Sequence, residues 1–190
     1  MTGSTLADDL LIRRKKVREA LVRAGMDGIL LASDVNIYYM TGRVFNGYFF
    51  LSADGEAQCF VRRPIDFTGE LVTFIRRPDD LTAYFKAQGC LLPQRLMLEA
   101  DGLSYNDYMR LATLFSPAET GNASTLMRAV RMVKTAWELE QMRCSAERHA
   151  ATYAEIPFCF RAGMTDLELQ AEIERRMRLN GSIGLFRASS

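Results

Sequence analysis

The chain has 190 residues, of which 48% are hydrophobic and 25% charged, and its 24 Lys and Arg nearly balance its 23 Asp and Glu. This composition is that of a globular protein and excludes disordered, collagen-like and membrane-spanning classes. The near-neutral charge gives no reason to expect a nucleic acid or an anionic membrane as a partner. The length suits one domain with part of a second, or two small domains.

The cysteines and the N-terminus indicate the compartment. Cys59, Cys90, Cys144 and Cys159 are irregularly spaced and form no CxxC pair, which argues against a disulfide framework and a structural zinc site. The N-terminus has no basic region followed by an apolar stretch, and no window approaches about 18 consecutive apolar residues. We therefore expect neither a signal peptide nor a membrane span, and we predict a cytoplasmic protein.

Residues 6–24 predict an amphipathic helix. Its apolar face carries Leu6, Leu10, Val17 and Leu21. We interpret the basic run RRKKVR, residues 13–18, as a solvated helix face and not as a nucleic-acid site, because no aromatic residues are interleaved with it. Gly25 suits the end of this helix, and the apolar GILLA that follows predicts a buried strand.

The stretch NIYYMTG, residues 36–42, is interpreted as a short structural helix. Ser33 or Asp34 can cap its start, and Gly42 can end it in the left-handed conformation. We expect its buried side to be formed by Val35, Tyr38 and Tyr39. Its role would be to fix the direction of the RVFN segment that follows.

Strands and helices then alternate. The strand candidates are residues 48–51, 58–61, 71–75 and 95–99, and the helix candidates are residues 78–88 and 104–114. A tight turn at Asp54-Gly55 joins the first two strands into a hairpin. This pattern predicts an α/β fold with three layers, α/β/α, and a mixed sheet covered on both faces.

After about residue 120 we predict no strand, and the pattern becomes helical. The predicted helices are residues 126–133, 136–160 and 165–180. Thr135 with Glu138, and Thr165 with Glu168, have the spacing of capping boxes. Pro157 either kinks the long helix or marks its last turn. The final GLFRASS looks like an element that is cut rather than finished.

Four segments, in this order, resemble the creatinase, prolidase and Xaa-Pro aminopeptidase family. They are IRRKKVREALVRAGMDGILLASDVNIYYMTG, the hairpin turn at Asp54-Gly55, RAVRMVKTAWELEQMR and GMTDLELQAEIERRM. The resemblance implies a creatinase/prolidase-type N-terminal α/β domain at residues 1–133. It also implies that residues 134–190 are the initial helices of an incomplete pita-bread catalytic domain.

The resemblance implies the N-terminal portion of a metal-dependent Xaa-Pro peptidase, either an aminopeptidase or a dipeptidase. In that family two Asp, one His and two Glu hold two divalent cations, manganese or cobalt, which activate a shared water. Those ligands match positions beyond Ser190. We therefore expect no cofactor, metal ligand or catalytic residue in this chain. The single histidine, His149, lies in a predicted helix without a carboxylate at ligand spacing.

The resemblance further implies a homodimer, in which a loop of one N-terminal domain reaches the catalytic pocket of the neighbouring subunit and helps to select a peptide substrate. The matching segment here is RVFNGYF, residues 43–49. Arg43 can pair with a substrate carboxylate, and Phe45 or Tyr48 can form a wall against an apolar side chain. Alternatively, Phe45 and Tyr48 pack at the end of the sheet and Arg43 is a solvated charge.

Other function classes stay open. One is a non-catalytic protein-binding module of a metal-free pita-bread homologue, as in a histone-chaperone subunit, and another is an amidinohydrolase of the creatinase type. Nucleophile and nucleotide chemistry have no support, because the sequence contains no GxSxG, GxGxxG or GxxxxGK arrangement. The metal ligands that would distinguish the remaining classes match positions beyond this sequence.

Overall fold

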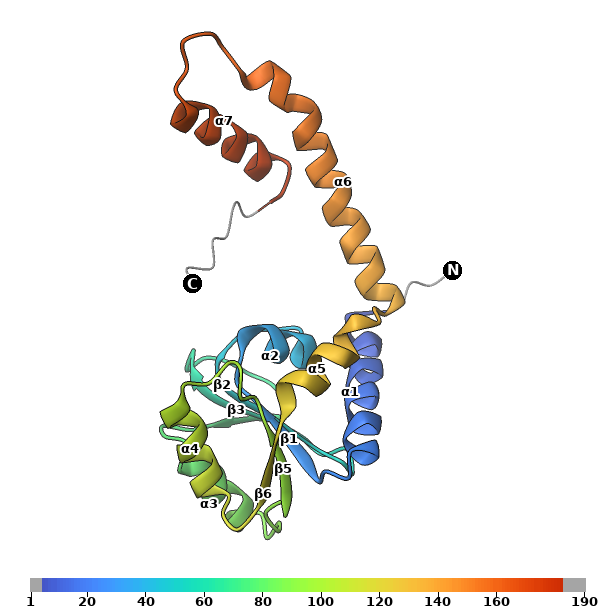
Figure 1. Ribbon diagram of the computed structural model, residues 1–190, viewed down its shortest axis with the longest axis vertical. Coiled ribbons are helices and arrows are strands. Elements are labelled where there is room, and N and C mark those ends of the chain that lie inside the picture. Colours follow the sequence, from blue (N-terminus) through green and yellow to red (C-terminus); the bar gives the residue numbers. More distant parts are fainter. Residues whose placement is uncertain (1–4, 183–190) are drawn as a thin grey trace. The chain divides into compact units, whose positions relative to one another are not determined.

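The computed structural model describes residues 5–182 and divides the chain into two compact units, Met1–Thr135 and Ala136–Ser190. Figure 1 shows the first unit in blue to yellow and the second in orange and red. The predicted cut element in the final GLFRASS lies outside the described residues. Among the described residues, no helix is long and apolar enough to cross a membrane.

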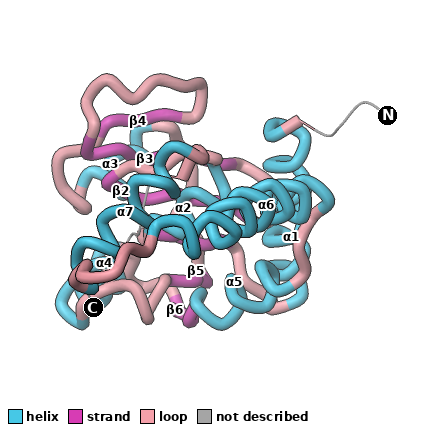
Figure 2. Tube along the Cα trace, turned by 90° about the horizontal axis from the view of Figure 1, so that it is seen from above, coloured by secondary structure: helices cyan, strands magenta, loops and turns pink. Residues whose placement is uncertain are grey.

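A six-stranded sheet forms the middle of the first unit, in the order β4-β3-β2-β1-β5-β6 (Figure 2). The strands are β1 (Gly28–Leu31), β2 (Asn46–Ser52), β3 (Ala57–Arg63), β4 (Val72–Phe74), β5 (Arg95–Leu98) and β6 (Glu119–Asn122). Strand β2 is antiparallel to both of its neighbours, whereas the other three pairings are parallel. The predicted α/β fold with a mixed sheet is confirmed.

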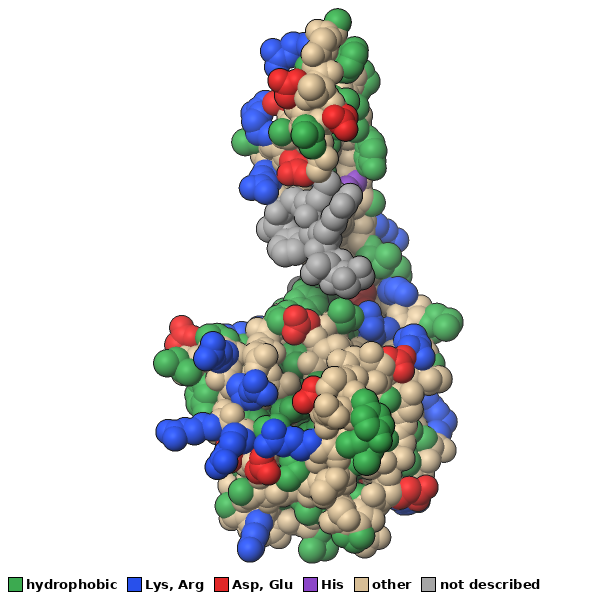
Figure 3. All heavy atoms as spheres, turned by 60° about the vertical axis from the view of Figure 1, so that its left-hand side comes forward, with side chains coloured by type: hydrophobic (Ala, Val, Ile, Leu, Met, Phe, Trp, Pro, Cys, Tyr) green, Lys and Arg blue, Asp and Glu red, His purple; other side chains and the backbone are tan. Residues whose placement is uncertain are grey.

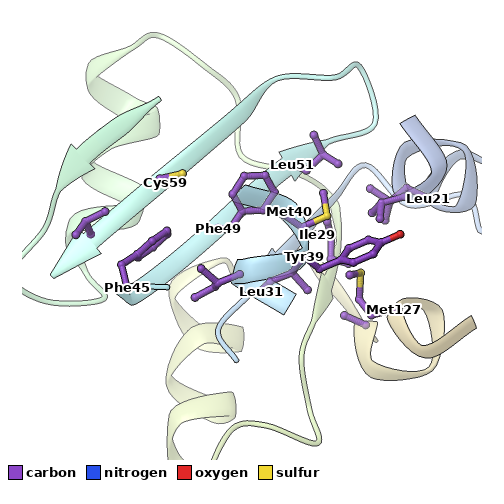
Figure 4. Packing of buried hydrophobic residues seen from close by; sticks show 14 of the residues in the cluster. Leu21, Ile29, Leu31, Tyr39, Met40, Phe45, Phe49, Leu51, Cys59 and Met127 are labelled. Atoms are coloured by element: carbon purple, nitrogen blue, oxygen red, sulfur yellow. The ribbon is translucent and has the colours of Figure 1, made fainter. Parts of the chain in front are cut away.

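Helices cover both faces of this sheet. One face packs against α1 (Leu6–Arg23), α2 (Asp34–Thr41) and α5 (Ala123–Met132), and the other against α3 (Asp80–Ala87) and α4 (Tyr105–Leu114). Successive strand residues alternate between the two cores, so that Phe49 and Leu51 belong to the first and Tyr48 and Phe50 to the second. Figure 4 shows the first core, with Leu21, Met40 and Met127 reaching the sheet from three helices.

Strand β6 is absent from the sequence-based prediction. Its residues, ETGN, are exposed or half-buried and show no apolar alternation. It forms because its backbone pairs in parallel with β5, at the edge of the sheet. The expectation of purely helical structure after about residue 120 is therefore wrong for the end of β6.

Helix α2 has the predicted caps, but of the three residues predicted for its buried side only Tyr39 is buried. Ser33 Oγ accepts a hydrogen bond from the Asn36 N–H, and Gly42 ends the helix at φ 70°. Val35 is 53% exposed and Tyr38 is 45% exposed, so neither belongs to the core. The buried residues of α2 are Asn36, Ile37, Tyr39 and Met40. The helix is rotated relative to the prediction because the polar Asn36 has a buried partner, described below.

Helix α1 buries a charge that was predicted to be solvated. Its buried face consists of Asp9, Arg13, Val17 and Leu21. Arg13 Nη2 lies 2.5 Å from Asp9 Oδ2, and Arg13 Nη1 donates to the Tyr39 carbonyl at 3.2 Å. The guanidinium also lies 4.9 Å from the centre of the Tyr39 ring. The ion pair makes burial of Arg13 possible, and the hydrogen bond fastens α1 to α2.

The second unit is, in its described part, a helical hairpin of α6 (Ala136–Cys159) and α7 (Asp166–Leu179). The predicted capping box of Thr165 and Glu168 is confirmed, and Pro157 lies in the last turn of α6. Hydrogen bonds from the Arg175 and Arg176 side chains lower the pKa of the Glu172 carboxyl to about 2. Figure 3 shows hydrophobic side chains between the charged ones on the visible face of this unit.

Replacement of Arg13 by methionine is expected to lower the free energy of unfolding by about 3–5 kcal/mol, because the buried Asp9 carboxylate loses its partner. Urea denaturation followed by circular dichroism measures this change. Lys15→Met, on the exposed side of the same helix, is the control and should change stability by less than about 0.5 kcal/mol. Equal stability of the two variants would contradict the role of the ion pair.

Candidate functional site

One edge of the sheet collects the ends of five strands. Strands β1, β3, β4, β5 and β6 all run in the same direction, because β2 alone is reversed between β1 and β3. Their carboxyl ends therefore lie on the edge where β2 begins. In open α/β sheets, ligands bind beyond the carboxyl ends of the strands. The segments at this edge therefore form the candidate site.

An open groove lies at this edge. It is lined by residues from the start of α2, the RVFN segment, the end of β3 and the loop that follows β3, namely Asp34, Val44, Phe45, Asn46, Arg63, Pro64, Ile65 and Asp66. We call it the RVFN groove. Val44 is 51% exposed and Ile65 is 84% exposed, so the groove offers apolar surface to solvent. Two carboxylates and one guanidinium flank this surface, which suits a small ligand with an apolar body.

The start of β2 sets the direction of the RVFN segment. The pairing between β2 and β3 shifts its register between Asn46 and Gly47, as at a β-bulge. Gly47 has φ 155°, and an added Cβ there would lie 2.0 Å from the Phe60 carbonyl oxygen. No other residue fits this position without moving the backbone of β3. The segment therefore enters the sheet along one fixed path.

Arg43 lies at the start of this segment, and its side chain is exposed. Thr41 Oγ1 accepts a hydrogen bond from the Arg43 N–H at 3.2 Å and donates one to the Arg43 carbonyl at 2.8 Å. Arg43 Nη1 donates to the Thr68 carbonyl at 2.9 Å, and the guanidinium carbon lies 3.7 Å from the centre of the Phe67 ring. Among the described residues, no carboxylate forms an ion pair with Arg43.

The structure does not bring Phe45 and Tyr48 to the surface beside Arg43. Phe45 is 2% exposed and lies in the first core, where its ring meets the Phe67 ring edge-on at 5.0 Å. Tyr48 is 7% exposed and lies in the core on the opposite face of the sheet, where burial raises the pKa of its hydroxyl. The two rings occupy packed positions, as in the alternative interpretation, and of these two residues only Phe45 lines the RVFN groove.

A buried carboxylate that the sequence analysis missed organises the same edge. Glu99 follows β5 and is 4% exposed. Its Oε2 accepts hydrogen bonds from the N–H groups of Ala32 and Ser33 at 2.8 and 2.9 Å, and its Oε1 accepts one from Asn36 Nδ2 at 2.7 Å. Asn36 Oδ1 in turn accepts one from Arg131 of α5 at 3.2 Å. The Glu99 carboxylate thus links β5 to β1 and α2 directly, and to α5 through Asn36.

The sequence did contain a signal for this network. Glu99 stands directly after the apolar strand RLML, and a carboxylate at the end of such a strand lies close to the core. A buried carboxylate needs several donors, and the N–H groups at the turn into a neighbouring helix can supply them. What the sequence does not give is which turn lies next to the end of β5.

The described residues do not fit the dinuclear metal centre that the family resemblance implies. Among residues 5–182, no group of three or more His, Cys, Asp or Glu side chains is placed to hold a metal ion. His149 is exposed on α6, and both Glu99 oxygens accept hydrogen bonds from the protein. Burial raises the pKa of the Cys59 thiol to about 11, which disfavours the thiolate that metal binding requires.

The fold and this edge identify the family once they are compared with known proteins. The family model of the creatinase/prolidase N-terminal domain matches residues 13–133. The chain belongs to this family. The matched range holds the complete sheet, the RVFN groove, Arg43 and the Glu99 network.

Similar proteins extend the relationship beyond the N-terminal domain. The uncharacterized peptidase YqhT of Bacillus subtilis (strain 168) is 22% identical over 180 residues. The Xaa-Pro dipeptidase from Bacillus anthracis is 25% identical with a TM-score of 0.78, over 92% of this chain and 50% of that chain. The prolidase from Pyrococcus furiosus, at 20% identity and a TM-score of 0.74 over 90% of this chain and 54% of that chain, shares the fold.

These matches also show how much of such proteins the chain represents. The match to YqhT covers 90% of this chain and 50% of YqhT, so the chain spans about half the length of the curated relative it matches. A match over 92% of the chain also extends beyond residues 13–133, into the helices of the second unit. The predicted relationship to the prolidase and Xaa-Pro dipeptidase family is confirmed.

We expect Glu99→Gln to lower the free energy of unfolding by about 2–3 kcal/mol, because an amide nitrogen would replace one accepting oxygen and face a donor of the protein. Chemical denaturation of both proteins tests this. Glu119→Gln on the exposed edge strand β6 is the matched control, with an expected change below about 0.5 kcal/mol. If Glu99→Gln and Glu119→Gln lower the free energy of unfolding equally, the hydrogen bonds of Glu99 do not hold β1, α2 and β5 together.

Proposed function

We propose that this chain is the N-terminal portion of a metal-dependent Xaa-Pro peptidase, without catalytic activity of its own. In the proposed protein it takes part in a homodimer and shapes the substrate pocket of the partner subunit. The observation that carries the proposal is the match to an Xaa-Pro dipeptidase over 92% of this chain but only 50% of that one. The metal centre, with manganese or cobalt, would belong to the unmatched half, and the whole protein would be cytoplasmic.

The surface of the second unit supports this assignment. Its described residues expose large apolar side chains, namely Leu139, Met142, Tyr153, Phe158, Phe160, Leu167 and Leu179. Apolar surface on this scale is unfavourable in water and normally marks an interface. We assign residues 134–190 to the start of a catalytic domain whose remaining part would cover these side chains.

Arg43 is the residue of the first unit through which we propose that substrate selection occurs. Of the three residues predicted for this role, it alone has an exposed side chain, since Phe45 and Tyr48 are buried. A guanidinium forms strong, directional hydrogen bonds with a carboxylate, and a peptide bears one at its C-terminus. In the proposed dimer, Arg43 would bind this carboxylate at the pocket of the partner subunit, while Phe45 and Tyr48 keep the loop and sheet in place.

Metal analysis tests whether the metal ligands lie outside this chain. The 190-residue chain is expected to retain no stoichiometric manganese or cobalt and to hydrolyse no Xaa-Pro dipeptide, because its described residues offer no ligand cluster. Reading the gene beyond the codon for Ser190 should reveal two Asp, one His and two Glu, and the protein that includes them should bind two cations. Tight metal binding by the chain alone, or the absence of these ligands from the gene, would refute the proposal; the latter outcome would favour a metal-free binding module.

Arg43→Ala, in the protein that joins this chain to its catalytic half, is expected to raise the KM for Xaa-Pro dipeptides by about 10-fold, because one charge-assisted hydrogen-bond pair is lost. The value of kcat should change little if Arg43 holds substrate and transition state equally. Arg23→Ala, an exposed arginine on α1, is the control. An unchanged KM for every dipeptide tested would remove Arg43 from the proposal.

A further inference from the structure

Arg43 carries a charge that is oriented but not neutralised. One of its five guanidinium N–H groups donates to the Thr68 carbonyl, and one face of the group is covered by the Phe67 ring. Within residues 5–182 no carboxylate pairs with it. An exposed arginine ordinarily samples many rotamers, and this freedom is lost when it binds a ligand. Here much of that freedom is already removed in the folded chain.

The support of Arg43 extends into the core. Phe67 is only 6% exposed, and its ring meets the buried Phe45 ring at 5.0 Å and an interplanar angle of 63°. Phe45 is part of the core cluster that includes Phe49 and Val61 of the sheet. The Arg43 guanidinium thus contacts the Phe67 ring, and the Phe67 ring contacts the Phe45 ring. Phe45 in turn packs in the first core with residues of the strands. This series of contacts gives Phe45 a supporting role in place of the predicted role as a wall.

We propose that Phe67, together with the Thr68 carbonyl, is a positioning residue that holds the Arg43 guanidinium as a preorganised receptor for a single carboxylate. The ligand class is a short peptide with a free C-terminal carboxylate and an apolar residue next to it. The identity of this ligand rests on the proposed function, whereas the positioning of Arg43 by Phe67 does not.

The surroundings of Arg43 favour a single carboxylate over a polyanion. Val44 and Asp66, the neighbours of Arg43 and Phe67 in sequence, line the RVFN groove together with Ile65. The apolar side chains of Val44 and Ile65 offer a surface for the nonpolar part of a ligand. The groove lining holds two carboxylates, Asp34 and Asp66, against one guanidinium, Arg63, and so gives no net attraction to a phosphate-rich chain or an anionic membrane.

Side-chain NMR of the 190-residue chain tests the positioning directly. The Nε–Hε signal of Arg43, assigned through Arg43→Lys, should show restricted motion in the original chain. Phe67→Leu, which keeps an apolar side chain against Phe45, should make this signal mobile, whereas Phe67→Tyr, which keeps the ring, should preserve it. Amide spectra verify that each variant is folded. An Arg43 signal that is equally mobile with and without the Phe67 ring would overturn the inference.

Titration with two probes tests the receptor. N-acetylproline bears a carboxylate, and N-acetylprolinamide has nearly the same shape without the charge. We expect only the acid to shift the Arg43 signal, with an affinity that is about 3- to 10-fold weaker in Phe67→Leu and restored in Phe67→Tyr. Equal shifts with both probes, or none with either, would refute the carboxylate receptor.

The two proposals can fail separately. If Arg43→Ala raises KM in the whole protein but Phe67→Leu changes neither the Arg43 signal nor KM, the proposed function stands and the positioning role of Phe67 falls. If Phe67→Leu mobilises Arg43 and weakens binding of N-acetylproline while Arg43→Ala leaves KM unchanged, the receptor stands and its use in peptide selection falls.

Discussion

The arrangement of the first unit around α2 depends on the buried carboxylate of Glu99. The Glu99 carboxylate accepts three hydrogen bonds, two from the backbone where β1 turns into α2 and one from Asn36. Burial of a carboxylate is unfavourable unless donors replace the lost water, so these partners are required and not optional. Because the donors come from the β1–α2 turn and the acceptor follows β5, the bonds fix the rotation of α2 against the sheet.

This rotation determines where Arg43 lies. Asn36 faces inward to reach Glu99, which turns Val35 and Tyr38 outward and brings Tyr39 against Arg13. Helix α2 then ends at Gly42, one residue before Arg43. The position of the exposed Arg43 therefore depends on the buried Glu99, which does not line the RVFN groove. The geometry of the groove is thus determined by contacts in the core.

The sequence predicted those features that depend on local chemistry. The caps at Ser33 and Gly42 and the capping box at Thr165 are confirmed, because each depends on residues within one turn of the chain. Strand β6 was missed because its polar residues form a strand only when β5 lies beside them. Arg13 was misassigned for a similar reason: its basic neighbours suggest a solvated face, and only the paired Asp9 and the packed α2 allow its burial.

The same distinction applies to the candidate site. Arg43 was selected through the family resemblance, because the segment RVFNGYF matches the loop that the resemblance assigns to substrate selection. Phe45 and Tyr48 stand three positions apart on either side of the bulge at Gly47, and the structure buries them in different cores, which depends on the strand register and not on local chemistry. Phe67 lies 24 positions after Arg43, in a loop with no periodicity, and only the folded chain places its ring beneath the guanidinium. The direction of the Arg43 guanidinium therefore depends on a contact between two segments, which the position of Arg43 in the sequence does not reveal.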